Sequence, residues 1–254
     1  MSLDRVDAYH EALEFFYLEP QHLRTKTKNT AGERSLRTVT RRLRRLEVTL
    51  NHNINQFLLL APVAFRARLF HKLFNDVFDH PFEMHGRNVD DDLGLQNSVQ
   101  PDFLFLSDRE VISIEMKIEA KSSLDQVLKY ASLGLAAEMR DGLARKHHLG
   151  FFGVGNFSNL WRAKFPSTTE LKCALTKQDL FAFLKKRPQR FRSQQGRFNE
   201  IVQQIALSFL SYRDLAEFLK TELPASPDAG QATEVYRNLI SGLLSEFDRR
   251  QLTR

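Results

Sequence analysis

Apolar residues recur at steps of three and four residues near both ends of the chain and in one stretch before its centre. Behind Pro62, the spacing of Leu69, Phe70, Leu73 and Phe74 gives a wide apolar stripe, which is typical of a buried helix. The helices predicted from these patterns span 3–18, most of 20–45, 62–79, 177–187, 198–221 and 232–250.

The strongest β-strand signal lies between residues 101 and 118. Phe103 to Leu106 is a short apolar run, Ser107 to Arg109 is typical of a turn, and Val111 to Ile118 alternates, so we expect a β-hairpin. A capped helix should follow, and a further strand is expected from His148 to Val154.

The helix after the hairpin has recognisable start and stop signals. Ser122 or Ser123 is expected to cap its first turn, with Asp125 or Gln126 completing a capping box. Gly142 is expected to end the helix. The polar residues 86–100 are typical of a loop or a mobile hairpin.

Together these elements predict an α/β protein with a central mixed β-sheet flanked by helices. We expect a basic helical N-terminal extension at 1–60, a core domain at 61–165, and a helical C-terminal region at 166–254 packed on the core. At 254 residues and 42% hydrophobic composition, the chain is long enough to bury a substantial core without stabilising metals or disulfides.

Composition excludes several classes of protein. The chain has one cysteine, Cys173, which excludes a disulfide framework and a four-cysteine cluster. No apolar run reaches the length of a membrane-spanning helix, and the early acids at 4, 7 and 11 do not fit a secretion signal, so a cytoplasmic protein is expected. The net charge of +6 favours a polyanionic partner.

The positive charge is concentrated in two clusters, at 24–45 and at 185–197. A solvated helix face and a phosphate-binding surface both explain such clusters. The residues that we expect to contact nucleic acid are Arg37, Arg41, Arg44, Arg45, Lys185, Lys186, Arg187 and Arg190.

The hairpin is also expected to bring acidic and basic side chains close together. Side chains alternate along a strand, so Glu115 and Lys117 should share one face. A turn centred on Asp108–Arg109 would place Glu115 opposite residue 102, which is an aspartate. Two neighbouring carboxylates repel each other, and a hard divalent cation such as Mg²⁺ relieves that repulsion.

At this point the chain resembles the PD-(D/E)xK nuclease superfamily, through Pro101–Asp102 and Glu115-Met116-Lys117. Gln126 to Tyr130 matches the QxxxY element of its RecB-like and lambda-exonuclease-like branch. The resemblance covers about residues 62–155 and implies a restriction-endonuclease-like core.

The resemblance also implies roles for individual residues. Asp102, Glu115 and the backbone carbonyl of Met116 would bind Mg²⁺ or Mn²⁺, and Lys117 would orient or deprotonate the attacking water. Gln126 and Tyr130 would support the site or grip the strand.

Two points in the pattern stay open. Many members of the superfamily carry a further metal ligand upstream, for which His71, Asp76, Asp79, His80, Glu83 and His85 are available. Glu83 is favoured because 82–84 resembles a strand entering the sheet. Glu119 and Lys121 offer a second ExK register, and Glu115 is favoured because Val111–Ile114 places it within the sheet.

We therefore expect a metal-dependent nuclease that hydrolyses DNA phosphodiester bonds, with internal and end-directed cleavage both open. The alternative is a non-catalytic nucleic-acid-binding or assembly protein on the same fold. A homodimer or a complex with a partner subunit is compatible with either, and no membrane association is expected. Trp161 and the pair His147–His148 are interpreted as core and strand-edge residues rather than ligands.

Overall fold

The protein is described here from a computed structural model covering residues 47–85, Leu93, Leu95, 101–163, 165–223 and 231–253. The helices expected at 3–18 and within 20–45, and most of the loop expected at 86–100, lie outside these residues. The chain divides into two compact units, one formed by Ala61–Ser211 and one to which the described helices at 47–60, 212–221 and 231–249 belong. Over the described residues, every helix is too short or too polar to cross a membrane.

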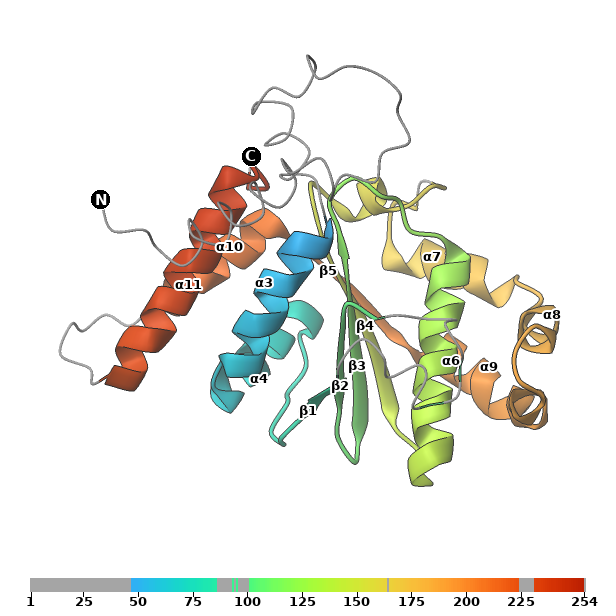
Figure 1. Cartoon of the computed structure of the whole chain (residues 1–254). Coiled ribbons are helices and arrows are strands. Elements are labelled where there is room, and N and C mark those ends of the chain that lie inside the picture. Colours follow the sequence, from blue (N-terminus) through green and yellow to red (C-terminus); the bar gives the residue numbers. More distant parts are fainter. Residues whose placement is uncertain are drawn as a thin grey trace, which may run out of the picture. The chain divides into compact units, whose positions relative to one another are not determined.

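A five-stranded mixed sheet forms the centre of the larger unit (Figure 1). Its strands follow sequence order across the sheet. Strand β2 pairs antiparallel with β1 and with β3, whereas β4 pairs parallel with β3 and with β5. The strands are β1 (Glu83–His85), β2 (Phe103–Leu106), β3 (Glu110–Lys117), β4 (Lys146–Gly153) and β5 (Ala206–Ser211).

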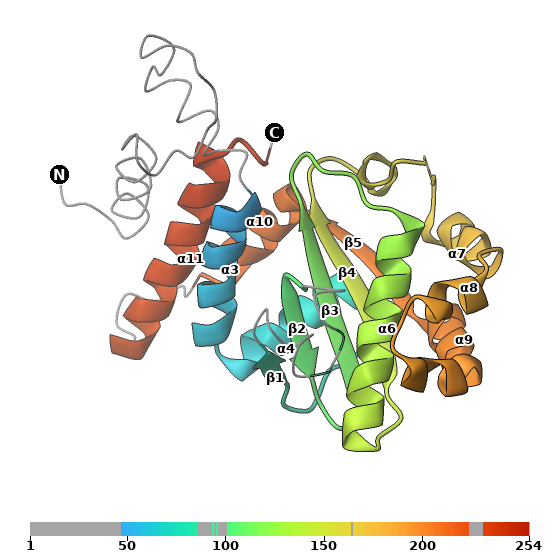
Figure 2. The same cartoon turned by 45° about the vertical axis from the view of Figure 1, so that its right-hand side comes forward.

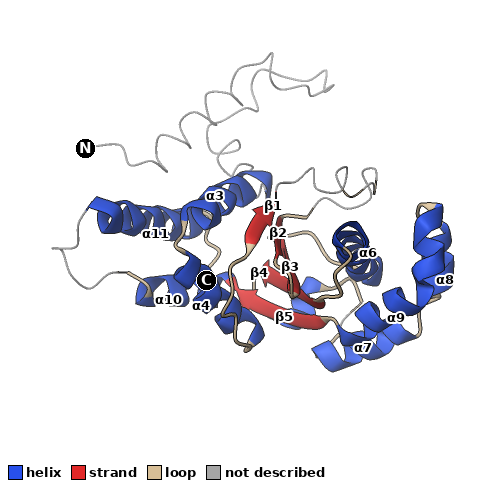
Figure 3. Ribbon diagram, turned by 90° about the horizontal axis from the view of Figure 1, so that it is seen from below, coloured by secondary structure: helices blue, strands red, loops and turns tan. Residues whose placement is uncertain are grey.

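Helices cover both faces of this sheet (Figures 2 and 3). Helix α4 (Val63–Phe74) packs on β4 and β5 from one face. Helices α6 (Leu124–Asp141) and α9 (Gln195–Gln204) pack on β4 from the other face, where α7 (Thr168–Thr176) and α8 (Leu180–Lys185) pack against α9. Two short 3-10 helices, η1 (Phe157–Leu160) and η2 (Gln189–Gln194), lie in the connections.

The predicted α/β class, with a mixed sheet flanked by helices, is confirmed. The predicted hairpin is also confirmed, and its register is the expected one, since Phe103 pairs with Ile114 and Leu106 with Val111. Ser107 closes the turn, accepting the backbone N–H groups of Arg109 and Glu110 on its hydroxyl. The tight turn leaves a single pairing register for the two strands.

Helix α4 ends earlier than the predicted limit at 79. Asn75 adopts a left-handed conformation (φ 52°, ψ 41°), and its N–H bonds to the carbonyl of His71, which terminates the helix. Val77, which the sequence placed on the apolar stripe, is consequently 73% exposed.

The prediction of one helix over 198–221 is wrong. Helix α9 ends at Gln204, and the chain then forms β5 before α10 (Tyr212–Thr221) begins. A short apolar run fits a helix and a buried strand equally well. Here parallel pairing with β4, from His148 opposite Ala206 to Gly153 opposite Ser211, selects the strand.

Two smaller predictions were also incorrect. The helix expected at 177–187 is shorter, because Asp179 caps α8 by accepting the N–H of Ala182. A separate helix, α7, precedes it and was not predicted. Ser123 is the N-cap of α6 but makes no side-chain capping bond. The side chain of Gln126 bonds to Glu115 instead of completing a capping box. Gly142 ends α6 as expected, at φ 69°.

The central strands β2, β3 and β4 are buried on both faces, as expected for strands with helices on either side of the sheet. The face under α6 packs Leu104, Val111, Leu149 and Phe151 against the helices. On the other face, Phe70 of α4 makes edge-to-face contacts with Phe78, Phe82 and Phe105, with ring centroids 5.0–5.6 Å apart.

The described part of the second unit contains three helices. Helix α11 (Gln231–Arg249), which matches the predicted helix at 232–250, packs on α10 and on α3 (Glu47–Leu60). The ring of Phe57 stacks on that of Tyr236, and that of Tyr212 packs on Phe247. Glu246 and Arg250 form a fully buried ion pair within this unit.

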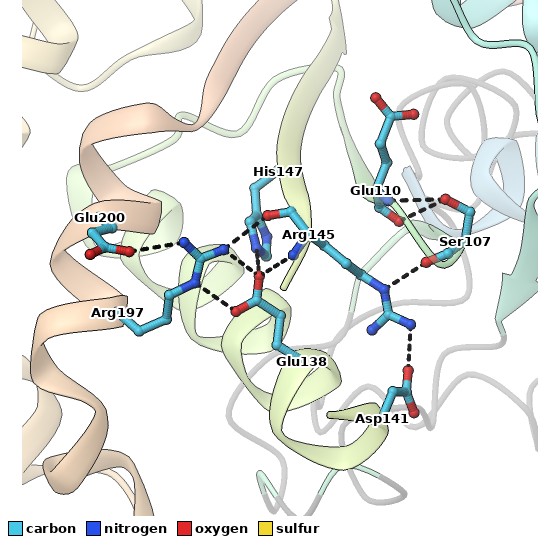
Figure 4. Close-up of polar contacts among 8 residues, drawn as sticks. All are labelled: Ser107, Glu110, Glu138, Asp141, Arg145, His147, Arg197 and Glu200. Carbon is cyan, nitrogen blue, oxygen red and sulfur yellow. Dashed lines mark hydrogen bonds and ion pairs between the residues drawn. The ribbon is translucent and has the colours of Figure 1, made fainter. Parts of the chain in front are cut away.

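A buried polar network joins α6, β4 and α9 (Figure 4). The carboxylate of Glu138 accepts the backbone N–H of Arg145 at 2.7 Å and the guanidinium of Arg197 at 2.6 and 2.8 Å, and it bonds to the His147 ring at 2.8 Å. Burial opposes ionisation of Glu138, but the bonds from Arg197, His147 and Arg145 outweigh it and lower its pKa to about 2. The network therefore holds α6 at a fixed position along the sheet.

Candidate active site

The open end of the β2–β3 hairpin brings together the residues predicted from its register. Since Phe103 pairs with Ile114, Asp102 and Glu115 are the next residues outward and face each other. Asp102 Oδ2 accepts the backbone N–H of Met116 at 2.8 Å, which fixes the carboxylate on the third strand.

Glu115 lies at the centre of this group and is only 5% exposed. Lys117 donates to its Oε1 atom, as does Gln126 at 2.5 Å, while the hydroxyl of Tyr130 donates to Oε2. Three donors from one strand and one helix thus converge on a single carboxylate, and all five predicted catalytic residues lie in one cluster.

Tyr130 is held as a neutral donor. Its side chain is buried, and desolvation is the main reason that its pKa lies well above the usual value of 10. The negative charges of Glu115 and then Asp102 raise the pKa further, so both carboxylates lie within electrostatic reach of the hydroxyl. At neutral pH the tyrosine therefore keeps its proton and donates a hydrogen bond to Glu115.

Local sequence explains how the helix supplies its two residues. Gln126 and Tyr130 are one helical turn apart, so both face the sheet from α6. The segment before α6 is fixed by a short parallel bridge, in which Ser122 bonds to the carbonyl of Leu160 at 2.8 Å and to the N–H of Arg162 at 3.1 Å. The first turn of α6 is thereby anchored next to Glu115.

The structure does not bring Glu83, the favoured third ligand, to this cluster. Strand β1 runs antiparallel to β2 and pairs Glu83 with Leu106, at the turn end of the hairpin, whereas Asp102 lies at the open end. The second ExK register also falls outside the strand, because β3 ends at Lys117 and the amine of Lys121 donates to the carbonyl of Asn159.

The four described basic residues of the predicted nucleic-acid surface lie at the end of α8, in the turn after it and in η2. Lys185 and Lys186 are exposed, and the amine of Lys185 lies 4.4 Å from the centre of the Phe181 ring. Burial lowers the pKa of Arg187, while Asp125 in the first turn of α6 acts in the opposite direction. Arg190 donates to the carbonyl of Leu93. The other predicted contacts, Arg37, Arg41, Arg44 and Arg45, lie outside the described residues.

Asp125 directly precedes Gln126 on α6, and its negative charge partly offsets the lowering of the Arg187 pKa by burial. Trp161 is 2% exposed and packs edge-to-face on Phe151 at 5.2 Å, so it is a core residue.

The donor set of the cluster fits Mg²⁺ or Mn²⁺. Two carboxylates and a backbone carbonyl, from Asp102, Glu115 and Met116, are oxygen ligands of the kind that these hard cations prefer. An ionised carboxylate offers about four lone-pair positions, and three donors on Glu115 leave one for a cation. Mg²⁺ usually takes one or two protein carboxylates and completes its shell with water.

A second polar group, at the opposite end of β3, was not predicted. Asp76, Glu110 and His148 offer ligand atoms that all lie within 4.8 Å of one another. Aspartate and histidine can both bind metals, but no spacing in the sequence relates Asp76 or His148 to Glu110. Burial is the largest cause that lowers the pKa of His148 to about 4 and also raises the pKa of Glu110.

Comparison of the chain with protein-family models, with curated proteins and with solved structures found no match.

Proposed function

We propose that this protein is a Mg²⁺- or Mn²⁺-dependent nuclease that hydrolyses DNA phosphodiester bonds in the cytoplasm, on a restriction-endonuclease-like core. The observation that carries the proposal is the convergence of Lys117, Gln126 and Tyr130 on the Glu115 carboxylate, beside Asp102. These five residues form one ordered motif in the sequence, and the β2–β3 hairpin and α6 bring them close together in the fold.

Each residue has a chemical role in this proposal. Asp102, Glu115 and the Met116 carbonyl would hold the cation, which when bound supplies a Lewis acid for the phosphate and lowers the pKa of a bound water. Lys117, whose side chain is 13% exposed, holds its ammonium against Glu115, where it would orient water and offset charge on the phosphate. Gln126 and Tyr130 prevent the Glu115 carboxylate from rotating away.

The basic residues of α8 supply the affinity for a phosphate backbone. Lys185 and Lys186 are exposed and directly precede Arg187. Burial lowers the pKa of Arg187, and the charge of Asp125, which precedes Gln126 of the candidate site, partly offsets this. Contacts of this kind bind DNA in a salt-dependent manner that is largely independent of sequence.

The direct test is incubation of the purified chain with linear, nicked and supercoiled DNA, with Mg²⁺ and with a chelator. We expect cleavage with Mg²⁺ that is lost in Lys117→Ala and in Asp102→Asn, while Lys121→Ala, a lysine just beyond the strand, retains it. The three DNA forms separate internal from end-directed cleavage. Equal cleavage by Lys117→Ala and the wild type would show that the active site is elsewhere.

One observation favours the alternative of a non-catalytic binding protein. Lys117, Gln126 and Tyr130 already neutralise and satisfy Glu115, as in a structural polar cluster. Titration calorimetry with Mg²⁺ separates the two functions. A nuclease site should bind Mg²⁺ in the wild type and not in Glu115→Gln, whereas a binding protein should bind DNA equally well in chelator and show no such metal binding.

A further inference from the structure

The group formed by Asp76, Glu110 and His148 lies on the opposite face of the sheet from the candidate active site. Glu110 begins β3, and alternation along this strand turns it to the side of Ile112, away from Glu115. Asp76 directly follows the end of α4, and His148 lies on β4 opposite Ile112. Three separate segments thus contribute one side chain each.

The three side chains are close enough to share an ion. Their ligand atoms lie within 4.8 Å of one another, and His148 Nε2 is 3.2 Å from Glu110 Oε1. His80 adds a second imidazole, with its Nε2 atom 3.1 Å from Glu110 Oε2. Figure 4 shows the Glu110 carboxylate directed away from Ser107 and Arg145, so the polar network on the other side does not engage it.

Hydrogen bonding within the described residues leaves this group incomplete. Glu110 is 7% exposed, yet its Oε2 atom and the facing Nε2 atom of His80 are both buried without a well-aligned hydrogen bond among those residues. The ring of His148 is fully buried, and it packs edge-to-face on Phe74 and Phe78 at 5.0 and 5.3 Å. A buried carboxylate that stays ionised requires a compensating positive charge.

The types of donor indicate which cation would compensate it. Imidazole nitrogens together with carboxylate oxygens are the ligands of Zn²⁺ and of neighbouring transition metals, and three such ligands with one water complete a tetrahedral shell. Mg²⁺ prefers oxygen ligands alone, so it suits the Asp102–Glu115 site and not this one.

We propose that Asp76, Glu110 and His148 form a Zn²⁺ site, with water as the fourth ligand and His80 beside Glu110 as an outer partner, which ties the end of α4 to the starts of β3 and β4. A groove lined by His80, Phe82, Glu83 and the turn residues Asp108 and Arg109 opens beside His80, which contacts Glu110. The site is independent of the proposed nuclease activity.

Lys146 competes with the ion for Asp76. Its amine forms an ion pair with Asp76 Oδ2, but the lysine side chain is 56% exposed and can turn into water. Zn²⁺ must displace this amine, so Lys146→Met should bind Zn²⁺ several-fold more tightly than the wild type. A purely structural role of the Asp76–Lys146 pair predicts no gain in affinity.

The experiment uses the full chain, stripped with a chelator and titrated with Zn²⁺ alone, and in parallel with Co²⁺ to record the visible absorption of a tetrahedral site. We expect one ion per chain, an increase in Tm with Zn²⁺, and tighter binding by Lys146→Met. Glu110→Gln and His148→Gln should weaken binding by more than the roughly 10–100-fold that loss of an outer-shell partner causes.

Matched variants separate the outcomes. Glu83→Gln changes a nearby carboxylate that is 79% exposed and pairs with His85, outside the proposed site, so this variant should bind Zn²⁺ like the wild type. Glu115→Gln should lose Mg²⁺ binding and retain Zn²⁺, so failure of the nuclease proposal and of this one are distinguishable. The proposal is overturned if the wild type binds no Zn²⁺, if Glu110→Gln binds as well as the wild type, or if Lys146→Met shows no gain.

Discussion

Asp102 Oδ2 accepts the backbone N–H of Met116 at 2.8 Å, across 14 residues of sequence. This bond makes the position of the first acidic residue depend on the strand that carries the second, because Met116 directly follows Glu115. Any shift in hairpin register would therefore break the bond and separate the two carboxylates.

Asp102→Asn and Asp102→Ala should consequently differ in stability. The asparagine carbonyl can still accept the Met116 N–H, whereas alanine leaves that partly buried group without its acceptor, at about 1–2 kcal/mol. Urea unfolding should show Asp102→Ala as the less stable variant, while both lose Mg²⁺ binding. Asp108→Ala, in the exposed turn of the same hairpin, should change stability by less than about 0.5 kcal/mol.

Tyr130→Phe isolates the support that α6 gives to Glu115. The ring remains in the core, but Glu115 Oε2 loses its donor, so unfolding free energy should fall by about 2 kcal/mol. If the nuclease proposal holds, activity should fall by about 10–100-fold. Lys129→Ala, which removes an exposed surface pair with Asp125 on the same helix, should match the wild type in both measurements.

Glu138→Gln should change how stability depends on pH. The folded pKa of Glu138 is about 2, below its unfolded value of 4.5, so its contribution is present above pH 4.5 and declines as pH falls toward 2. At pH 7 the variant should be less stable by about 3 kcal/mol. Urea unfolding between pH 7 and 3 should show this difference narrowing, and a constant gap would contradict the assignment.

Exposed Glu200 provides the comparison for this pH series. It bonds to the same guanidinium of Arg197 at 3.0 Å, but its side chain is 58% exposed. Glu200→Gln should therefore alter stability by no more than about 1 kcal/mol at any pH.

Gly134→Ala tests how closely α6 approaches β4. A Cβ atom at position 134 would lie 2.2 Å from Nδ1 of His147, so the ring would have to move away from Glu138. We expect destabilisation of about 1–3 kcal/mol in thermal or urea unfolding. Gly196→Ala in α9 meets no heavy atom of the described chain within 4 Å and should instead stabilise by about 0.5–1 kcal/mol.

Among the basic residues, the exposed lysines should determine DNA affinity, whereas those that neutralise buried acids should determine stability. Lys185→Ala combined with Lys186→Ala should lower the salt-dependence slope of DNA binding by up to about 2 without changing Tm. Arg197→Ala should show the opposite behaviour, with reduced stability, because its guanidinium neutralises buried Glu138. Fluorescence anisotropy at several salt concentrations measures the slope, and an unchanged slope in the lysine variant would exclude this surface.

The parts of the fold that sequence predicted well are those in which local signals agree. The turn at Ser107–Arg109 and the alternation of β3 fix the hairpin register, which in turn brings Asp102 opposite Glu115. The spacing of Gln126 and Tyr130 on a helix with a clear glycine stop places both on one face. These relationships span few residues, so they need no information about distant contacts.

Predictions failed where a distant partner decides the conformation. Residues 206–211 became a strand because β4 offers an unpaired parallel edge, which their own pattern cannot reveal. Glu83 was assigned to the wrong end of the sheet because the direction of β1 depends on its pairing with β2.

The chain's own pattern of residues thus determined an α/β core, a hairpin with one register, and the five side chains at its open end. Tertiary structure alone decided the fifth strand, the network around Glu138, and the meeting of Asp76, Glu110 and His148 from segments up to 72 residues apart. The physical reason is that turn geometry and strand alternation act over a few residues. Long-range pairing and burial are instead settled only when the whole sheet and its covering helices pack together.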